Sequence, residues 1–182
     1  MQAEIKKVEL RNLALEDYKQ LKNSMVEAYP EMANSYWRSS DIKKLLSIFP
    51  EGQLVILVDG VVVGSALSLI VDEKLVDKRH NYKQIIGDYT FSTHNPNGEI
   101  LYGIDVFIHP NYRGLRLCRR LYDARKELCE QLNLKAIVFA GRIPNYNQYA
   151  KKLSPKNYIE KVKDKELHDP VLSFQLSNDF NV

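Results

Sequence analysis

The sequence predicts an α/β domain in which helices cover both faces of a mixed sheet. Two strand-like runs, Leu54–Val58 and Val61–Leu67, flank Asp59-Gly60 and read as an antiparallel hairpin. Further along the chain, strand-like and helix-like segments alternate, as they do where helices pack on a sheet. The 182 residues contain no internal repeat and no low-complexity linker, so we expect one domain over 1–182.

Three segments before the hairpin carry regular patterns. Val8–Arg11 alternates like a first strand, and Leu15–Ala28 places apolar residues at helical spacing. A second helix is expected over Asp41–Phe49, with Ser39 or Ser40 as its N-cap. The chain is therefore expected to begin with a strand and two helices.

The second half of the chain alternates strands with helices. Strands are expected over Glu99–Ile108, Ala136–Ala140 and Val171–Leu176, and helices over Leu115–Leu132, from Pro144 to about Leu153, and Pro155–Lys163. The mixed polar stretch 72–97 has no clear period. We expect it to be mobile or to face a substrate, because such loops often carry function.

The helix over Leu115–Leu132 carries positive charge where a helix disfavours it. Its first turns contain Arg116, Arg119 and Arg120, while Glu127 and Glu130 stand near its end. A helix N-terminus already has unpaired N–H groups and about half a positive charge. A bound anion such as phosphate would compensate these charges. The alternative is a solvated basic face, on which Arg119 pairs with Asp123 four residues later.

An apolar stripe on the same helix predicts core packing. Its members are Leu117, Leu121, Ala124, Leu128 and Leu132, widened by Cys118, Tyr122 and Cys129. A thiol near helix-start arginines can have a lowered pKa, so Cys118 is also a candidate nucleophile. Because it has no partnered histidine nearby in the sequence, we interpret Cys118 as a packing residue.

The run Ile108–Leu121 resembles the acyl-CoA motif of the GNAT superfamily of N-acyltransferases. In that motif a strand ends near a proline, Tyr-Arg-Gly follows, and a loop of the pattern Gln/Arg-x-x-Gly-x-Gly/Ala opens a helix. Arg113 matches the first position, whereas Arg116 and Cys118 replace the small residues. The resemblance implies that acetyl-CoA is the cosubstrate and that loop amides hold its pyrophosphate. The implied binding residues are Phe107, Ile108, Arg113, Gly114, Leu115, Arg116, Leu117, Cys118, Arg119 and Asn147.

A longer resemblance covers the chain from about Glu99 to its end. The segments 101–106, 121–125, 141–146 and 169–176 follow one another as in the GNAT-type domain at the N-terminus of bacterial nitrilase-like carbon–nitrogen hydrolases. It implies a GNAT fold with a mixed, mostly antiparallel central sheet and helices on both faces. A fused or associated hydrolase is also implied, although nothing in these 182 residues encodes one.

The family's chemistry implies roles for a few residues. A backbone N–H of the split strand polarises the thioester carbonyl, here near Phe107 or Ile108. Asn147 begins the pattern Asn-x-x-Ala, but position 154, where the family often has its proton-donating Tyr, is Ser. Tyr149 is our first choice for that general acid, with Tyr146 and Tyr158 as substitutes. Asp105 is a candidate general base, unless it is a structural carboxylate that caps or pairs at the strand.

Composition excludes several other functions. A net charge of +3 is too small to indicate nucleic-acid binding, and no apolar stretch approaches the roughly 20 residues of a membrane helix. The N-terminus has no signal-like apolar run, so we expect a cytoplasmic protein with Cys118 and Cys129 reduced. Histidine spacing indicates no metal site.

Acetyl-CoA-dependent N-acetyl transfer to a primary amine is the function that the sequence favours. The amine is a small molecule or a protein side chain, and a homodimer is left open. The alternative is a non-catalytic acyl-CoA-binding or regulatory module related to a hydrolase fusion. The altered loop at Arg116 and Cys118 and the Ser at position 154 favour that alternative.

Overall fold

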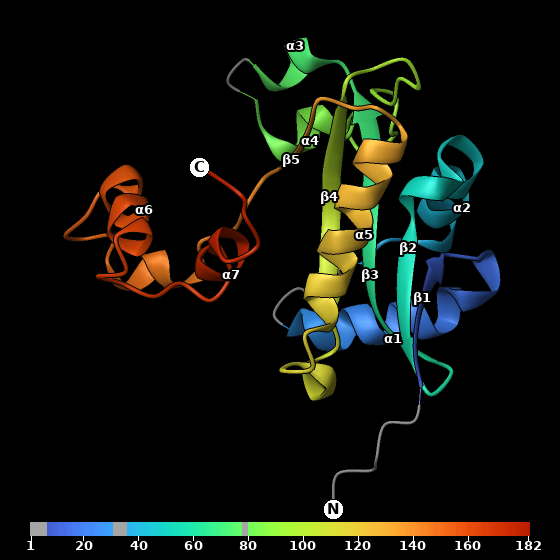
Figure 1. The fold of residues 1–182 in the computed structure, drawn as a ribbon, viewed down its shortest axis with the longest axis horizontal. Coiled ribbons are helices and arrows are strands. Elements are labelled where there is room, and N and C mark those ends of the chain that lie inside the picture. The colour runs from blue at the N-terminus through green and yellow to red at the C-terminus, as the bar shows by residue number, and fades with distance from the viewer. Residues whose placement is uncertain (1–6, 31–35, 78–79) are drawn as a thin grey trace, which may run out of the picture. The chain divides into compact units, whose positions relative to one another are not determined.

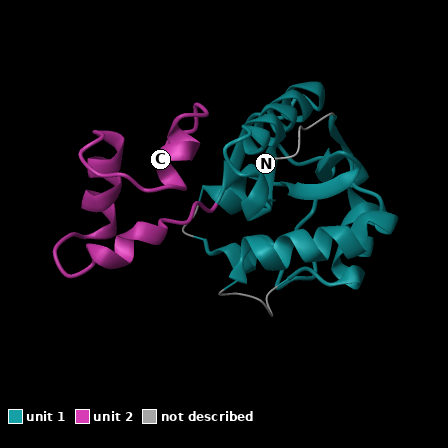
Figure 2. Ribbon diagram, turned by 90° about the horizontal axis from the view of Figure 1, so that it is seen from below, with its two compact units in different colours: residues 1–139 teal, residues 140–182 magenta. Residues whose placement is uncertain are grey.

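The computed structural model describes residues 7–30, 36–77 and 80–182. They form two compact units, one that ends at Phe139 and one over Ala140–Val182 (Figures 1 and 2). Each unit has an apolar cluster of its own. Residues 1–6, where the sequence predicts no signal-like run, lie outside the described residues. The expectation of a single domain over the whole chain stays a prediction.

The first unit contains a five-stranded sheet with the order β1-β2-β3-β4-β5 (Figure 1). Its strands are β1 Val8–Asn12, β2 Leu54–Val58, β3 Val61–Val71, β4 Ile100–Ile108 and β5 Ala136–Phe139. The first three pairings are antiparallel, and β4 pairs with β5 in parallel. The expected mixed, mostly antiparallel sheet is therefore confirmed.

The β2–β3 hairpin follows from its turn residues. Asp59 and Gly60 have φ of 48° and 81°, which places both central residues in the left-handed region. A two-residue turn of that kind matches the right-handed twist of the flanking strands. Both strands are buried and rich in valine, leucine and isoleucine, so the hairpin lies in the middle of the sheet.

Helices cover both faces of this sheet. The helices α1 Tyr18–Ala28 and α2 Ser39–Ile48 pack on the face that carries Val55 and Leu57. The long helix α5 Leu117–Gln131 packs on the face that carries Leu54 and Ile56. The other short helices among the described residues of this unit are α3 Glu73–Val76, α4 Tyr82–Ile85, η1 Leu15–Asp17, η3 Pro50–Gly52 and η4 Pro110–Tyr112.

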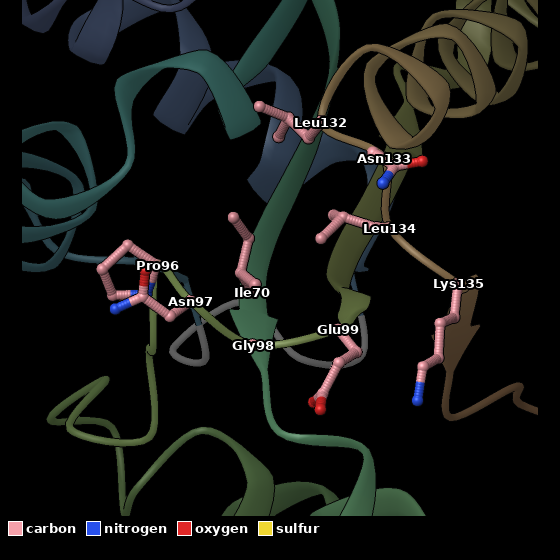
Figure 3. A pocket seen from close by; sticks show the side chains of 9 residues that line it. All are labelled: Ile70, Pro96, Asn97, Gly98, Glu99, Leu132, Asn133, Leu134 and Lys135. Atoms are coloured by element: carbon pink, nitrogen blue, oxygen red, sulfur yellow. The ribbon is translucent and has the colours of Figure 1, made fainter.

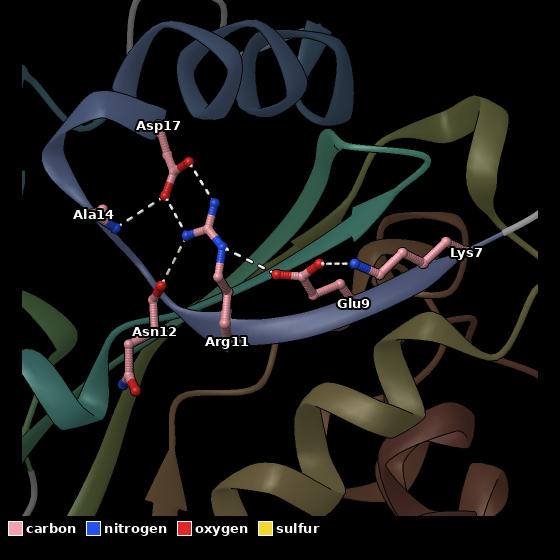
Figure 4. Close-up of polar contacts among 6 residues, drawn as sticks. All are labelled: Lys7, Glu9, Arg11, Asn12, Ala14 and Asp17. Carbon is pink, nitrogen blue, oxygen red and sulfur yellow. Dashed lines mark hydrogen bonds and ion pairs between the residues drawn. The ribbon is translucent and has the colours of Figure 1, made fainter.

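An ion pair fixes the junction between β1 and the helix that follows it (Figure 4). Two guanidinium nitrogens of Arg11 lie 2.7 and 2.8 Å from the two carboxylate oxygens of Asp17. Asp17 also accepts the N–H of Ala14 at 2.9 Å. These donors lower the pKa of Asp17, because they favour its charged form.

Two sequence expectations about helices are wrong in detail. The N-cap of α2 is Arg38, not Ser39 or Ser40, because the carboxylate of Asp41 accepts the Arg38 N–H at 2.8 Å and starts the helix earlier. Leu132, expected in the α5 core stripe, is 40% exposed because α5 ends at Gln131.

The second unit consists of helices around a tyrosine-rich cluster. These are η5 Pro144–Gln148, α6 Pro155–Lys163 and α7 Leu172–Leu176. The expected helix at Pro155 is confirmed, with Ser154 accepting the Asn157 N–H at 3.2 Å as its N-cap. The expected helix from Pro144 is shorter than predicted, because it ends at Gln148 in a 3-10 turn.

The expected last strand over Val171–Leu176 is wrong, because this segment is the helix α7. The buried carboxylate of Asp169 accepts the N–H groups of Val171 and Leu172 at 3.1 and 3.0 Å. Such capping bonds satisfy the first unpaired amides of a helix. Leu172 and Leu176, four residues apart, then point into the same apolar cluster.

Candidate functional site

A loop with two unusual backbone conformations joins β4 to α5. After η4, Gly114 has φ of +84°, and nothing lies within 4 Å of the position that a Cβ would take there. Arg116 has φ of 57° and ψ of 19°, the left-handed region that costs an L-residue roughly 1–2 kcal/mol. The family's pattern places a glycine at position 116, and the backbone adopts the conformation that glycine favours.

The first turn of α5 leaves its amides without helical partners. Arg116 is the N-cap but makes no side-chain capping bond. The first helical bond runs from the Arg120 N–H to the Arg116 carbonyl at 3.3 Å. The N–H groups of Leu117, Cys118 and Arg119 therefore precede the intrahelical ladder and are suited to an anion.

Four arginines surround this helix start with their side chains exposed: Arg113, Arg116, Arg119 and Arg120. Among the described residues none of the four forms an ion pair, and the expected pairing of Arg119 with Asp123 is not formed. Arg113 reaches only the Ala28 carbonyl, at 3.5 Å. Their charge is available to a ligand. Exposed cations beside unpaired helix amides are suited to a phosphate group.

Of the apolar loop residues, Leu117 and Cys118 pack against the sheet and Leu115 does not. Leu115 is 41% exposed, whereas Leu117 is buried against the sheet. Burial raises the pKa of the Cys118 thiol to about 11, so this thiol is neutral near pH 7. That environment agrees with the interpretation of Cys118 as a packing residue rather than a nucleophile.

Strand β4 separates from its neighbour halfway along its length. It pairs with β5 only from Ile100 to Gly103, and within the described residues no strand pairs with that edge beyond Gly103. The His109 N–H donates to Val63 on β3 at 2.7 Å. Because N–H directions alternate along a strand, the Phe107 amide also faces β3 and the Ile108 amide faces the open edge. Of the two expected positions, Ile108 is the one suited to polarise a carbonyl.

The side chain of Asp105 lies beside this open edge. It is partly buried, and it accepts hydrogen bonds from the Tyr29 hydroxyl at 3.0 Å and the Trp37 indole N–H at 2.9 Å. Burial raises the pKa of Asp105, and the two hydrogen bonds and the charge of Arg125 oppose that rise. A carboxylate with a raised pKa is suited to accept a proton, while its two donors fix its position.

Tyr82, from the polar stretch, also reaches this strand. Its hydroxyl donates to the Ile104 carbonyl at 2.8 Å. Burial raises the pKa of Tyr82, with a further contribution from the charge of Asp105. Part of the stretch 72–97 therefore packs over the candidate site, although residues 78–79 lie outside the described part. Its expected mobility stays a prediction.

The tyrosines expected as general acids belong to the second unit. The Tyr146 hydroxyl donates to the Leu153 carbonyl at 2.9 Å, and the buried Tyr158 hydroxyl donates to Asp169 at 2.9 Å. The Tyr149 ring packs 5.4 Å from that of Tyr158. In the described part of the chain its hydroxyl has no hydrogen bond, so Tyr149 is the one of the three that can still offer a proton. Asn147, in η5, is exposed.

Sequence reasoning missed Tyr29, Trp37 and Arg125. Arg125 is only 1% exposed and donates to the Asp105 carbonyl. One signal was present: Arg125 follows Leu121 by four residues and therefore lies on the apolar stripe of α5. No comparable signal marks Tyr29 or Trp37, because their contact with Asp105 joins residues 76 and 68 positions apart.

A surface hollow lies away from this site (Figure 3). Ile70, the turn at 96–99 and the loop 132–135 line it. It adjoins the start of β4, whereas the arginine-rich loop follows the end of β4. The hollow is therefore not part of the candidate site. Among the described residues, every helix is too short or too polar to span a lipid bilayer.

Comparisons with known proteins point to one family. The model of the acetyltransferase (GNAT) family matches residues 12–156. The uncharacterized N-acetyltransferase YkwB of Bacillus subtilis is 31% identical over 169 residues, which cover 92% of this chain and 75% of YkwB. The probable hydrolase YhcX of the same organism is 39% identical over 177 residues, or 97% of this chain. The chain spans only 34% of the length of YhcX.

Solved structures share the fold. The loading GNATL domain of CurA from Lyngbya majuscula has a TM-score of 0.78 at 21% identity, covering 94% of this chain and 83% of that one. The GphF GNAT-like decarboxylase in complex with isobutyryl-CoA has a TM-score of 0.75 at 19% identity, covering 93% and 84%.

Proposed function

The chain belongs to the acetyltransferase (GNAT) family, and we propose that it transfers an acetyl group from acetyl-CoA to a primary amine. The observation that carries this proposal is the uncapped start of α5, which follows a strand with an open edge and is surrounded by unpaired arginines. Only a short loop therefore separates the Ile108 amide, which is suited to polarise a carbonyl, from the amides at the start of α5, which are suited to bind an anion. That combination suits a ligand with a pyrophosphate at one end and a thioester at the other.

The loop residues have separable roles in holding the cosubstrate. The amides of Leu117, Cys118 and Arg119 would bind the pyrophosphate, and Arg116 would add charge-assisted hydrogen bonds. The edge of β4 from Phe107 to Ile108 would hold the pantetheine arm. Bound acetyl-CoA supplies an activated acyl group as a thioester.

Direct attack by the amine requires three functions of the protein. The amine nitrogen forms a bond to the carbonyl carbon while the carbon–sulfur bond breaks, so the amine loses a proton and the thiolate gains one. Asp105 accepts the proton, directly or through a water, and the Ile108 N–H polarises the carbonyl. Tyr149 donates to the departing thiolate. Much of the rate enhancement comes from holding the two substrates close together in one complex.

The acceptor is a small-molecule or protein amine. The stretch 72–97 is suited to shape its site, because Tyr82 from that stretch contacts β4 beside Asp105. We propose a cytoplasmic location, and we leave a homodimer as an open arrangement.

A second candidate function rests on the comparison with YhcX. This chain is 39% identical to about one third of that probable hydrolase. The domain would then bind acyl-CoA without turnover and regulate a carbon–nitrogen hydrolase that is fused to it or associated with it. Ser154 supports this candidate, because it caps α6 where the family often has a catalytic tyrosine.

Thiol release from acetyl-CoA, measured with a panel of primary amines, tests the proposal. We expect amine-dependent release that Asp105→Asn slows by about 10²- to 10⁴-fold. Binding of acetyl-CoA with no release by any amine would favour the regulatory candidate. Isobutyryl-CoA and a β-carboxylated acyl-CoA extend the panel, because one similar structure is a GNAT-like decarboxylase in complex with isobutyryl-CoA. Loss of carbon dioxide without consumption of amine would contradict acetyl transfer.

A further inference from the structure

The guanidinium of Arg125 lies inside an irregularity between β3 and β4. Leu67 pairs with Asp105 and Ser68 pairs with Gly103, so Ile104 has no partner and β4 bulges. Arg125 donates to the carbonyls of Leu67 and Asp105, and its Nε donates to the Ser68 hydroxyl at 3.1 Å. One side chain from α5 thus ties both strands together at the bulge.

A positive charge at this place is costly for packing alone. The Arg125 side chain is 1% exposed, and a guanidinium cannot shed its charge by losing a proton. Burial lowers the pKa of Arg125, while the nearby carboxylate of Asp105 opposes that change. A buried charge is costly unless it is hydrogen-bonded, and the donors of Arg125 go to the two carbonyls and the Ser68 hydroxyl at the bulge.

The bulge determines what lies at the open edge of β4. Asp105 is the last residue of the bulge. The amides of Val106 and Ile108 follow it, and they face the edge of β4 that β5 does not cover. Without Arg125, the carbonyls of Leu67 and Asp105 would lose the donors that join them at the bulge, and nothing else among the described residues of α5 would hold the register there. A slip by one residue would move the Asp105 side chain to the other face of the sheet. It would also turn the Ile108 amide away from the open edge.

We propose that Arg125 is a positioning residue that holds the β4 bulge, and with it Asp105 and the Ile108 amide, in the arrangement needed for acetyl transfer. Its catalytic role rests on the proposed function, whereas its hold on Asp105 does not. Among the described residues, the charged and titratable groups that face Asp105 from the surrounding elements are Tyr29 from the end of α1, Tyr82 from α4 and Arg125 from α5.

Steady-state kinetics of the full chain test the catalytic role. Arg125→Lys keeps a charge but loses the planar fork of donors, and Arg125→Met loses both. Gly103→Ala leaves Arg125 unchanged but places a Cβ 3.0 Å from its Nη1. We expect kcat to fall roughly 10- to 100-fold in all three, because a small misplacement of reacting groups is costly. Affinity for CoA should stay within about 2-fold, since no CoA-binding residue changes.

A second readout needs no activity. Trp37 is the only tryptophan, and its indole N–H donates to Asp105. The pH dependence of its single ¹⁵N indole resonance therefore reports the protonation of Asp105. We expect the midpoint in Arg125→Met and Gly103→Ala to move to higher pH, because the cation that favours the carboxylate is lost or displaced. Arg125→Lys should move it least. Glu130→Gln, exposed on the same helix, is the matched control and should change neither readout.

The outcomes separate this proposal from the proposed function. If the variants turn over amines like the wild type with an unchanged indole midpoint, Arg125 is merely structural and the proposal is overturned. If Arg125→Met does not fold, kcat and the indole midpoint of Gly103→Ala and Arg125→Lys decide between the same two outcomes. If the midpoint moves as expected but the wild type acetylates no amine, acetyl transfer fails while the hold of Arg125 on Asp105 stands.

Discussion

Gly103 provides the space that the guanidinium of Arg125 occupies. A Cβ at position 103 would lie 3.0 Å from Nη1 and 3.3 Å from the central carbon of that guanidinium. The glycine lies within β4, where a residue without a side chain weakens a strand. Here its absence of a side chain lets an arginine from α5 reach the bulge beside Asp105. The candidate base, the bulge and a buried cation thus depend on one small residue.

Arg116→Gly tests whether this side chain contacts phosphate. We expect the affinity for acetyl-CoA to fall by about 1–3 kcal/mol, the contribution of a charge-assisted hydrogen bond. Stability should not fall, and it should rise by up to about 1 kcal/mol, because position 116 has a left-handed backbone. Calorimetry and urea unfolding measure the two quantities.

Arg116→Asn is the matched control, because asparagine tolerates the left-handed conformation but lacks the charge. It should lose as much affinity as the glycine variant. Tighter binding by Arg116→Gly would mean that Arg116 crowds the loop and that backbone amides alone hold the phosphate.

Asp105→Asn should reduce kcat by about 10²- to 10⁴-fold, as for a lost general base, with little change in CoA affinity. In the wild type, kcat should rise with pH as Asp105 ionises. The raised pKa of Asp105 places this rise above the usual titration range of aspartate. A variant with the wild-type rate would make Asp105 a structural carboxylate held by Tyr29 and Trp37.

Tyr149→Phe should slow turnover roughly ten- to ten-thousand-fold, while CoA affinity stays nearly unchanged. The matched comparison is Tyr146→Phe, whose hydroxyl is already bonded to the Leu153 carbonyl. It should keep its turnover number. Equal rates for wild type and Tyr149→Phe would transfer the role of acid to another group or to solvent.

The Arg11–Asp17 pair should make stability depend on acid pH. The pKa of Asp17 is lower in the folded chain than in the unfolded chain, so its contribution is complete above the unfolded value near 4. It is lost as the pH falls through the folded value. Asp17→Asn should cost about 1 kcal/mol at pH 7, discounted because Arg11 is partly exposed, and almost nothing at the acid end. Urea unfolding at several pH values measures this difference, and equal losses at every pH would contradict it.

Local patterns predicted much of the fold. The hairpin turn at Asp59-Gly60 and the proline-led start of α6 depend on residues adjacent in sequence, and both were confirmed. Val171–Leu176 alternates like a strand but is a helix, because Asp169 caps its first amides. The hydrogen bonds from Asp169, which precedes the segment, therefore outweighed the alternating pattern of Val171–Leu176.

The candidate site was predictable only in part. The arginine-rich loop was visible because its residues are consecutive. The partners of Asp105 were not, since Tyr29 and Trp37 approach it through tertiary packing. Arg125 carried only the signal of its place on the apolar stripe of α5, because the glycine that makes room for it lies on another element. Contacts between distant segments carry no periodic signal in a single sequence.

The central claim is that the cosubstrate binds at the start of α5. Titration of the ¹⁵N-labelled chain with acetyl-CoA, followed by amide resonances, tests it directly. We predict that the largest shifts lie in Arg113–Arg119 and at Ile108, and that binding weakens as salt is added, because phosphate contacts are screened. Shifts confined to the hollow lined by Ile70 and Lys135, or no shifts at millimolar acetyl-CoA, would contradict the claim.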